Sequence, residues 1–159
     1  MNIFVLHENP RTAAQMHCDK HVIKMILESA QMLSTALHLH DAPKRPLQYK
    51  PTHAKHPCTL WAAKSRDNFL WLAELGLELV NEHLYRYERA KPHKSYAVIR
   101  DAQSVAHLLP ATGLTPFAQA MPVHYKRESA VEAYRAYYLG DKMRFVTYKR
   151  RPAPAWLSS

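Results

Sequence analysis

The chain has 159 residues, of which 47% are hydrophobic and 10% aromatic, and this is enough to fill the core of one domain but not of two. The formal net charge of +9 and the pI of about 9.7 are typical of proteins that bind nucleic acid or another polyanion. Three glycines against 11 prolines favour helices joined by stiff loops over a hairpin-rich β fold. We therefore expect residues 1–159 to form a compact, mostly α single domain with a short extended N-terminal segment.

The first third of the chain predicts a buried arm, one long helix and a loop. Residues 2–6 are apolar and indicate a short buried strand or an extended arm. Asn9-Pro10 is a typical helix start, and no glycine or proline interrupts the pattern from Arg11 to about His38. Prolines and basic residues then predict an extended loop over residues 41–57.

The rest of the chain predicts further helices separated by proline-marked loops. Pro57 opens a short helix to about Lys64, and Ser65 is a candidate N-cap for the next one. The longer predicted helices cover Arg66 to about Arg86, Ser95 to Leu109, and Glu128 to Leu139, the last stopped by Gly140. In the predicted helix from Arg66 to about Arg86, the residues expected to point into the core are Leu72, Leu75, Leu79 and Val80.

A narrow polar stripe runs along the first predicted helix. Its members recur at spacings of three and four and fall within roughly an 80° sector: His17, His21, Lys24, Glu28, Gln31 and Thr35. Apolar residues occupy nearly all the rest of the helix, which predicts that the fold largely encloses it. Two imidazoles, a carboxylate and an ammonium are groups that transfer protons or stabilise charge near neutral pH.

Two other interpretations of the stripe remain open. It can be the solvent-exposed face of an amphipathic helix. Alternatively, His17 and His21 at i and i+4 can bind one metal ion, although His-x-x-x-His alone is a weak signal. Cys18 points about 100° away from His17 and is a poor third ligand.

Basic residues interleaved with aromatic ones gather in the long loop and near the C-terminus. Such tracts contact phosphates while stacking on bases, although a solvated loop has the same composition. The predicted nucleic-acid contacts are Lys20, Lys24, Lys44, Arg45, Lys50, His53, Lys55, His56, Lys126 and Arg150.

Cysteine usage and the absence of known motifs limit the compartment and the chemistry. Only Cys18 and Cys58 are present, which is too few for a disulfide scaffold and favours a reducing compartment. No apolar run is long enough to span a membrane, and the first residues lack the features of a signal peptide. No phosphate-loop, dinucleotide or thiol-redox motif is present. We therefore expect a cytoplasmic monomer with no cofactor and no membrane partner.

Most of the chain resembles a group of small phage-borne proteins of uncharacterised function. The resemblance begins with Met-Asn-Ile-Phe-Val-Leu and continues through His17-Cys18-Asp19-Lys20-His21 to Glu28. It extends to Pro51-Thr52-His53, His56-Pro57, Met121-Pro122 and the pattern Tyr134-Arg135-x-Tyr137-Tyr138.

A second resemblance is to the phage pyrimidine-dimer DNA glycosylases. Asp19-x-His21 followed by Glu28 is similar to the pattern on the first helix of that family. Further similar positions are Pro51-Thr52, His56, Glu82, Arg86, Arg151-Pro152 and Trp156. Ile3 and Leu27 stand where the family has arginines.

The resemblance implies a helical enzyme that flips a base out of duplex DNA. In that family an N-terminal α-amine attacks the sugar C1′ atom and a glutamate assists, so Glu28 would be the acid or base and His21 an electrostatic partner. An α-amine is less basic than a lysine amine and is therefore the more usable nucleophile at neutral pH. Because Asn2 is not small, we expect Met1 to be retained and to carry the amine, with Lys20 and Lys24 as alternatives.

The sequence thus predicts an enzyme that acts on duplex DNA by base excision, or by another base-directed reaction on a flipped nucleotide. The predicted catalytic residues are Glu28, His21, His17 and Met1. The alternatives are a metal-dependent nucleic-acid enzyme that uses His17 and His21, and a non-catalytic nucleic-acid-binding protein.

Overall fold

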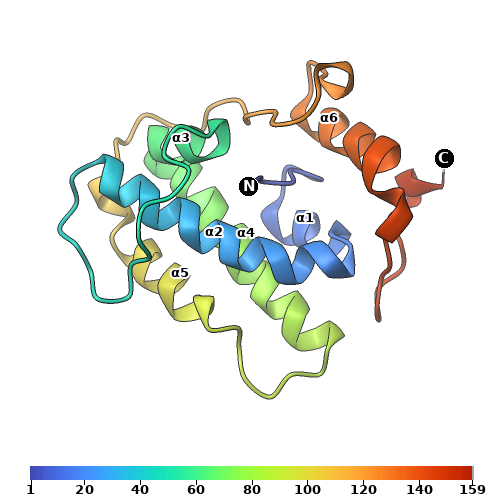
Figure 1. Ribbon diagram of the computed structural model, residues 1–159, viewed down its shortest axis with the longest axis horizontal. Coiled ribbons are helices and arrows are strands. Elements are labelled where there is room, and N and C mark those ends of the chain that lie inside the picture. The colour runs from blue at the N-terminus through green and yellow to red at the C-terminus, as the bar shows by residue number, and fades with distance from the viewer. Residues whose placement is uncertain (159) are drawn as a thin grey trace.

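A computed structural model describes residues 1–158, which are mostly helical and contain no β-strand (Figure 1). The α-helices are α1 (Pro10–Met16), α2 (Asp19–Leu39), α3 (Pro57–Lys64), α4 (Arg66–Arg86), α5 (Ser95–Ser104) and α6 (Ala130–Tyr137). A π-helical turn, Tyr138–Lys142, follows α6, and short 3-10 turns cover Ala106–Leu108, Val123–Tyr125, Met143–Phe145 and Ala155–Leu157. The predicted mostly helical fold is confirmed. No helix among residues 1–158 combines the length and apolarity needed to cross a bilayer.

The core forms where α2 and α4 cross, with α5 packed against both (Figure 1). Gly76 of α4 lies at this crossing, where an added Cβ would lie 2.9 Å from Ile99 Cδ1 and 3.3 Å from Ser29 Cβ. A glycine here therefore permits the close approach of three helices. The predicted inward residues Leu72, Leu75, Leu79 and Val80 are all buried.

The predicted helix from Arg11 to about His38 is two helices, because the chain is extended at His17 and Cys18. Their ψ angles are 136° and 159°, outside the helical range. No glycine or proline marks this break in the sequence. Its cause is tertiary: Arg86 of α4 donates hydrogen bonds to the carbonyls of Gln15 (2.9 Å) and His17 (2.7 Å), which end α1.

The N-terminal segment is a buried extended arm without a strand partner. Ile3 through Leu6 are buried, and Phe4 packs between α2 and α6 by stacking on His21 and meeting the ring of Tyr134 edge to face. Arg135 of α6 donates to the Leu6 carbonyl at 3.0 Å. The arm is thus held by side chains rather than by a sheet, and this brings Met1 to the middle of α2 (Figure 1).

The helices on either side of Ser65 begin and end as predicted, and the later ones are shorter. Ser65 Oγ accepts the Asn68 amide at 3.0 Å and caps α4. Helix α5 ends at Ser104, before a separate 3-10 turn. Gly140 does not stop α6 as predicted but lies inside the π-helical turn, where the Tyr125 side chain fills the space that a Cβ would need.

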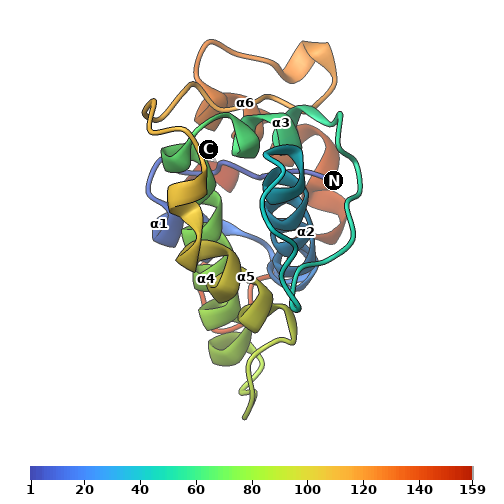
Figure 2. The same cartoon turned by 90° about the vertical axis from the view of Figure 1, so that its left-hand side faces the viewer.

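Two loops mark the ends of the molecule. Figure 2 shows the connection between α4 and α5 projecting at one end, while the long connection before α6 covers α3 at the other. The predicted loop 41–57 runs back along α2, where Thr52 N donates to Thr35 Oγ1 and Thr35 Oγ1 donates to the Thr52 carbonyl, both at 3.1 Å.

Candidate active site

A cavity of about 360 Å³ opens on the exposed face of α2 beside the N-terminus. Segments far apart in the sequence meet there, because the N-terminal arm, loop 41–57 and the connection before α5 all reach this face. The lining residues are Met1, Ile23, Lys24, Leu27, Glu28, Gln31, His53 and His93. The lining therefore combines a carboxylate, an ammonium and two imidazoles with apolar side chains.

Glu28 is the acidic residue of this cavity and is bonded to the N-terminus. The Met1 nitrogen lies 3.3 Å from Glu28 Oε1 and forms an ion pair with it. The Asn2 amide donates to the same oxygen at 3.0 Å, and Lys24 Nζ lies 3.9 Å from Oε2. Glu28 is 8% exposed. A carboxylate in this position can accept a proton from the Met1 amine. If Met1 were removed, the nitrogen of Asn2 would become the α-amine and would face the same carboxylate.

The side chain of Asn2 anchors the start of the chain from the opposite side. Its Nδ2 donates to the Ala120 carbonyl at 2.9 Å, and its Oδ1 accepts the Tyr134 hydroxyl at 2.9 Å. Burial raises the pKa of Tyr134 well above the ordinary tyrosine value, so the hydroxyl keeps the proton that it donates. Burial likewise raises the pKa of Cys58 to about 11, and its thiol contacts Asn2 Oδ1 at 3.6 Å. The two cysteines are free and buried.

His17 and His21 do not line the cavity. His17 ends α1 and its Nδ1 lies 2.6 Å from the Ala13 carbonyl, whereas His21 lies on α2 with Nδ1 2.6 Å from the Tyr138 hydroxyl. Burial lowers the pKa of His17 to about 4. Burial, followed by the charges of His17 and nearby lysines, lowers the pKa of His21 to about 3. The expectation that both share a helix face with Glu28 is wrong for His17, because the chain is extended there.

In the described part of the chain, no third ligand accompanies His17 and His21 for the metal ion that the sequence allowed. Within residues 1–158, no group of three or more His, Cys, Asp or Glu side chains is placed so that it could hold a metal ion. His17 Nε2 is buried without a hydrogen-bond partner in the structure.

The predicted nucleic-acid contacts fall into three environments. Lys24 and His53 line the cavity, whereas His56 caps the start of α3. Arg45 makes a bidentate ion pair with Asp101 at 2.7 and 2.8 Å, and Arg150 bonds to Glu88 and to the Tyr85 carbonyl. The remaining predicted contacts are exposed: Lys20, Lys44, Lys50, Lys55 and Lys126.

His93 is a cavity residue that the sequence pattern did not indicate. Its Nδ1 accepts the Ser95 amide at 3.0 Å at the start of α5, which orients the ring. Burial, followed by the charge of Lys94, lowers its pKa below the ordinary histidine value. The only local signal is its place two residues before a helix, and nothing in the sequence connects it with Glu28.

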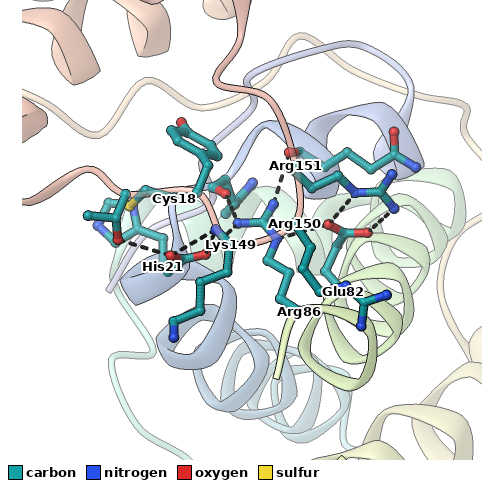
Figure 3. Close-up of polar contacts among 12 residues, drawn as sticks. Cys18, His21, Glu82, Arg86, Lys149, Arg150 and Arg151 are labelled. Carbon is teal, nitrogen blue, oxygen red and sulfur yellow. Dashed lines mark hydrogen bonds and ion pairs between the residues drawn. The ribbon is translucent and has the colours of Figure 1, made fainter. Parts of the chain in front are cut away.

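A buried ion network at the start of α2 joins α1, α2, α4 and the C-terminal tail (Figure 3). Arg86 Nη1 lies 3.1 Å from Asp19 Oδ1 and its Nε 3.0 Å from Glu82 Oε1. Arg151 Nη2 lies 2.7 Å from Glu82 Oε2, and the Lys149 amide donates to Asp19 at 3.0 Å. Burial alone would raise the pKa of Glu82, but the hydrogen bonds and charges of Arg151 and Arg86 outweigh it and lower the pKa.

Comparison with protein-family models, with curated proteins and with solved structures found no match to this chain.

Proposed function

We propose that this protein is a DNA-acting enzyme of the base-excision type, in which the α-amine of Met1 attacks the sugar C1′ atom of a flipped nucleotide. The observation that carries the proposal is the amine of Met1 lying 3.3 Å from Glu28 Oε1 at an open cavity. An amine beside a largely buried carboxylate is a nucleophile paired with its base. The resemblance to the pyrimidine-dimer glycosylases agrees with this assignment of roles.

The reaction uses only the substrate and protein groups that line the cavity. Glu28 takes a proton from the Met1 ammonium, and the nitrogen lone pair forms a bond to C1′. The bond from C1′ to the base breaks, and the base leaves with its electron pair and takes the proton that Glu28 had accepted. The bond from C1′ to the ring oxygen then breaks, the ring oxygen takes one proton from the nitrogen, and a protonated imine joins Met1 to C1′. Glu28, again a carboxylate, removes a C2′ proton, and the bond from C3′ to the phosphate oxygen breaks with its electron pair leaving on the phosphate, which cleaves the strand.

The charges around the cavity suit a DNA backbone. Lys24 lies at the cavity, and Lys50 and Lys55 extend from the adjacent loop without an ion pair among the described contacts. Ile23 and Leu27 of α2 are 39% and 37% exposed at the cavity and offer an apolar contact to a base or sugar. Phosphate contacts of this kind orient the duplex without reading its sequence.

Glu28→Gln tests the proposal because it keeps the size of the side chain and removes the base. We expect cleavage of a duplex with one abasic site to slow at least about a hundredfold, while the Kd for a non-cleavable abasic analogue changes less than about twofold. Glu74→Gln, at an exposed position of α4, is the matched control and should behave as wild type. Equal loss of binding and cleavage, or unchanged cleavage, would refute the assignment of Glu28.

A further inference from the structure

We propose that His93 is a catalytic residue of the strand-cleavage step, an inference that rests on the proposed function of the Met1 amine. In this role its Nε2–H group donates a hydrogen bond to the phosphate on C3′ as that phosphate leaves. His93 precedes α5 and lines the same cavity as Met1 and Glu28. One cavity thus holds the amine, the carboxylate and this imidazole.

The contact to the backbone determines which nitrogen of the His93 ring is left for a ligand. The Ser95 amide donates to His93 Nδ1 at 3.0 Å. A backbone amide can donate only to a ring nitrogen without a proton, so the neutral ring is protonated at Nε2. The lowered pKa of His93 favours this neutral form. Within residues 1–158 no hydrogen bond engages Nε2, which therefore offers one N–H donor to a ligand in the cavity.

Neighbouring elements hold the His93 ring in place. The ring of His83, which is buried on α4, meets it edge to face with the ring centroids 6.0 Å apart. Ser95, which orients the ring, is itself bonded to loop 41–57, because its Oγ lies 2.8 Å from the Tyr49 hydroxyl. A donor held in this way needs little reorganisation when charge develops on an acceptor beside it.

The contents of the cavity indicate a phosphate as the acceptor for this donor. Among the described residues that line the cavity, Glu28 is the one carboxylate, and it is already bonded to the Met1 nitrogen, the Asn2 amide and Lys24. The acceptor for His93 must therefore come from the substrate. Because C3′ is the second carbon round the sugar ring from C1′, a sugar bound at Met1 brings its C3′ phosphate to the same cavity.

The hydrogen bond from His93 acts on the elimination and not on the formation of the imine. When Glu28 removes the C2′ proton, the bond from C3′ to the phosphate oxygen breaks, and a phosphodiester monoanion becomes a phosphomonoester dianion. His93 keeps its proton and stabilises the added charge. No such charge develops on the phosphate while the nitrogen attacks C1′. Removing the donor should therefore slow strand cleavage and leave imine formation unchanged.

Two substitutions separate the donor from the contact to the backbone. His93→Asn keeps an acceptor for the Ser95 amide but has no donor at the position of Nε2. His93→Gln places an amide N–H group near that position. The matched control is His107→Gln, because His107 is exposed and does not line the cavity.

The experiment measures two rates on a duplex with one abasic site, with protein in excess. Borohydride trapping gives the rate of imine formation, and the appearance of the cut strand gives the rate of elimination. We expect His93→Asn to form the imine within about twofold of the wild-type rate but to cut at least about tenfold more slowly, with Tm near wild type. His93→Gln should keep at least about a third of the wild-type cutting rate, and His107→Gln should match wild type in both steps.

Equal slowing of both steps in His93→Asn, or unchanged cutting, would overturn the assignment of His93. A wild-type protein that forms no imine would refute the proposed function instead. The phosphate contact is then decided by NMR of the wild-type His93 ring during titration with the non-cleavable abasic analogue. A shift of the Nε2 resonance would support the contact, and an unchanged resonance at saturation would exclude it.

Discussion

Glu28 and His21 lie on the same helix, about 10 Å apart along its axis, and face different surroundings. Glu28 meets the amine of Met1 at an open cavity, whereas His21 is buried between Phe4 and Tyr138. A stripe of polar residues along a helix therefore does not identify a single site. The arm that covers part of the stripe decides which side chains can meet a substrate.

The buried histidines make stability depend on pH. The pKa of His17 is about 4 and that of His21 about 3 in the folded protein, against 6.5 for an unfolded chain. Between these values the unfolded chain binds more protons, so stability is full above pH 6.5 and falls as the pH drops. Each histidine should lower the free energy of unfolding by about 1.4 kcal/mol per pH unit in that window.

Urea denaturation between about pH 6.5 and pH 4 measures this dependence. His21→Asn should reduce the slope of stability against pH by the contribution of one histidine, while His38→Asn, at an exposed position on the same helix, should leave it unchanged. The same slope in all three proteins would show that His21 is not protonated on unfolding.

At the scale of the helices, Arg86 is the residue that terminates α1 and fixes the start of α2. Its guanidinium bonds to two carbonyls at the end of α1 and to the carboxylates of Asp19 and Glu82, and its side chain is completely buried (Figure 3). Removing it leaves two buried carboxylates with fewer partners and uncaps a short helix.

Arg86→Met should therefore lower the free energy of unfolding by about 3–5 kcal/mol. Arg86→Lys should also destabilise, because an ammonium cannot bond to all these groups at once. Arg100→Met on the exposed face of α5 is the control and should change stability by less than about 0.5 kcal/mol. A loss from Arg86→Met no larger than that of the control would contradict the role assigned to Arg86.

Helices α1, α3 and α4 show which helix ends can be predicted from local sequence. Pro57 and Ser65 are start signals that act on neighbouring residues, and α3 and α4 begin where these residues predicted. The break at His17 and Cys18 has no such mark, because the carbonyls that end α1 are satisfied by a side chain 69 residues further along the chain. The prediction that Gly140 stops α6 is wrong for a related reason. A glycine stands there because the Tyr125 side chain occupies the space that a Cβ would need.

For the whole molecule, the net charge of +9 predicts polyanion binding, but it does not say which cations are available. Arg45 and Asp101 form a closed bidentate pair, so this arginine adds little net charge to the surface. Lys50 is exposed on the loop that carries His53 to the cavity. The composition therefore predicts a polyanionic partner, and the structure distinguishes basic side chains that are paired with carboxylates from those that are exposed.

Lys50→Ala should reduce the slope of log K against log salt concentration for duplex DNA by about 0.9, as expected for one lost phosphate contact. Arg45→Ala should change this slope less, because its guanidinium is occupied by Asp101. Fluorescence anisotropy over a series of salt concentrations gives both slopes. A larger change for Arg45→Ala than for Lys50→Ala would place the DNA elsewhere on the surface.

The site itself could be predicted only in part. Glu28, Lys24 and the amine of Met1 were predicted from the polar stripe and from the resemblance, and the structure brings them together. His93 was missed because its proximity to Glu28 depends on how α5 packs against α2, which no short-range pattern records. The buried position of His17 likewise follows from the helix break.

We propose that the amine of Met1 forms an imine with the sugar of a DNA substrate. The most direct test is borohydride trapping of the protein on duplex DNA with one abasic site, followed by mass mapping of the adduct. We expect a covalent adduct on the α-amine of Met1, or of Asn2 if Met1 has been removed. No adduct while salt-sensitive DNA binding is intact, or an adduct on Lys20 or Lys24 instead, would contradict it.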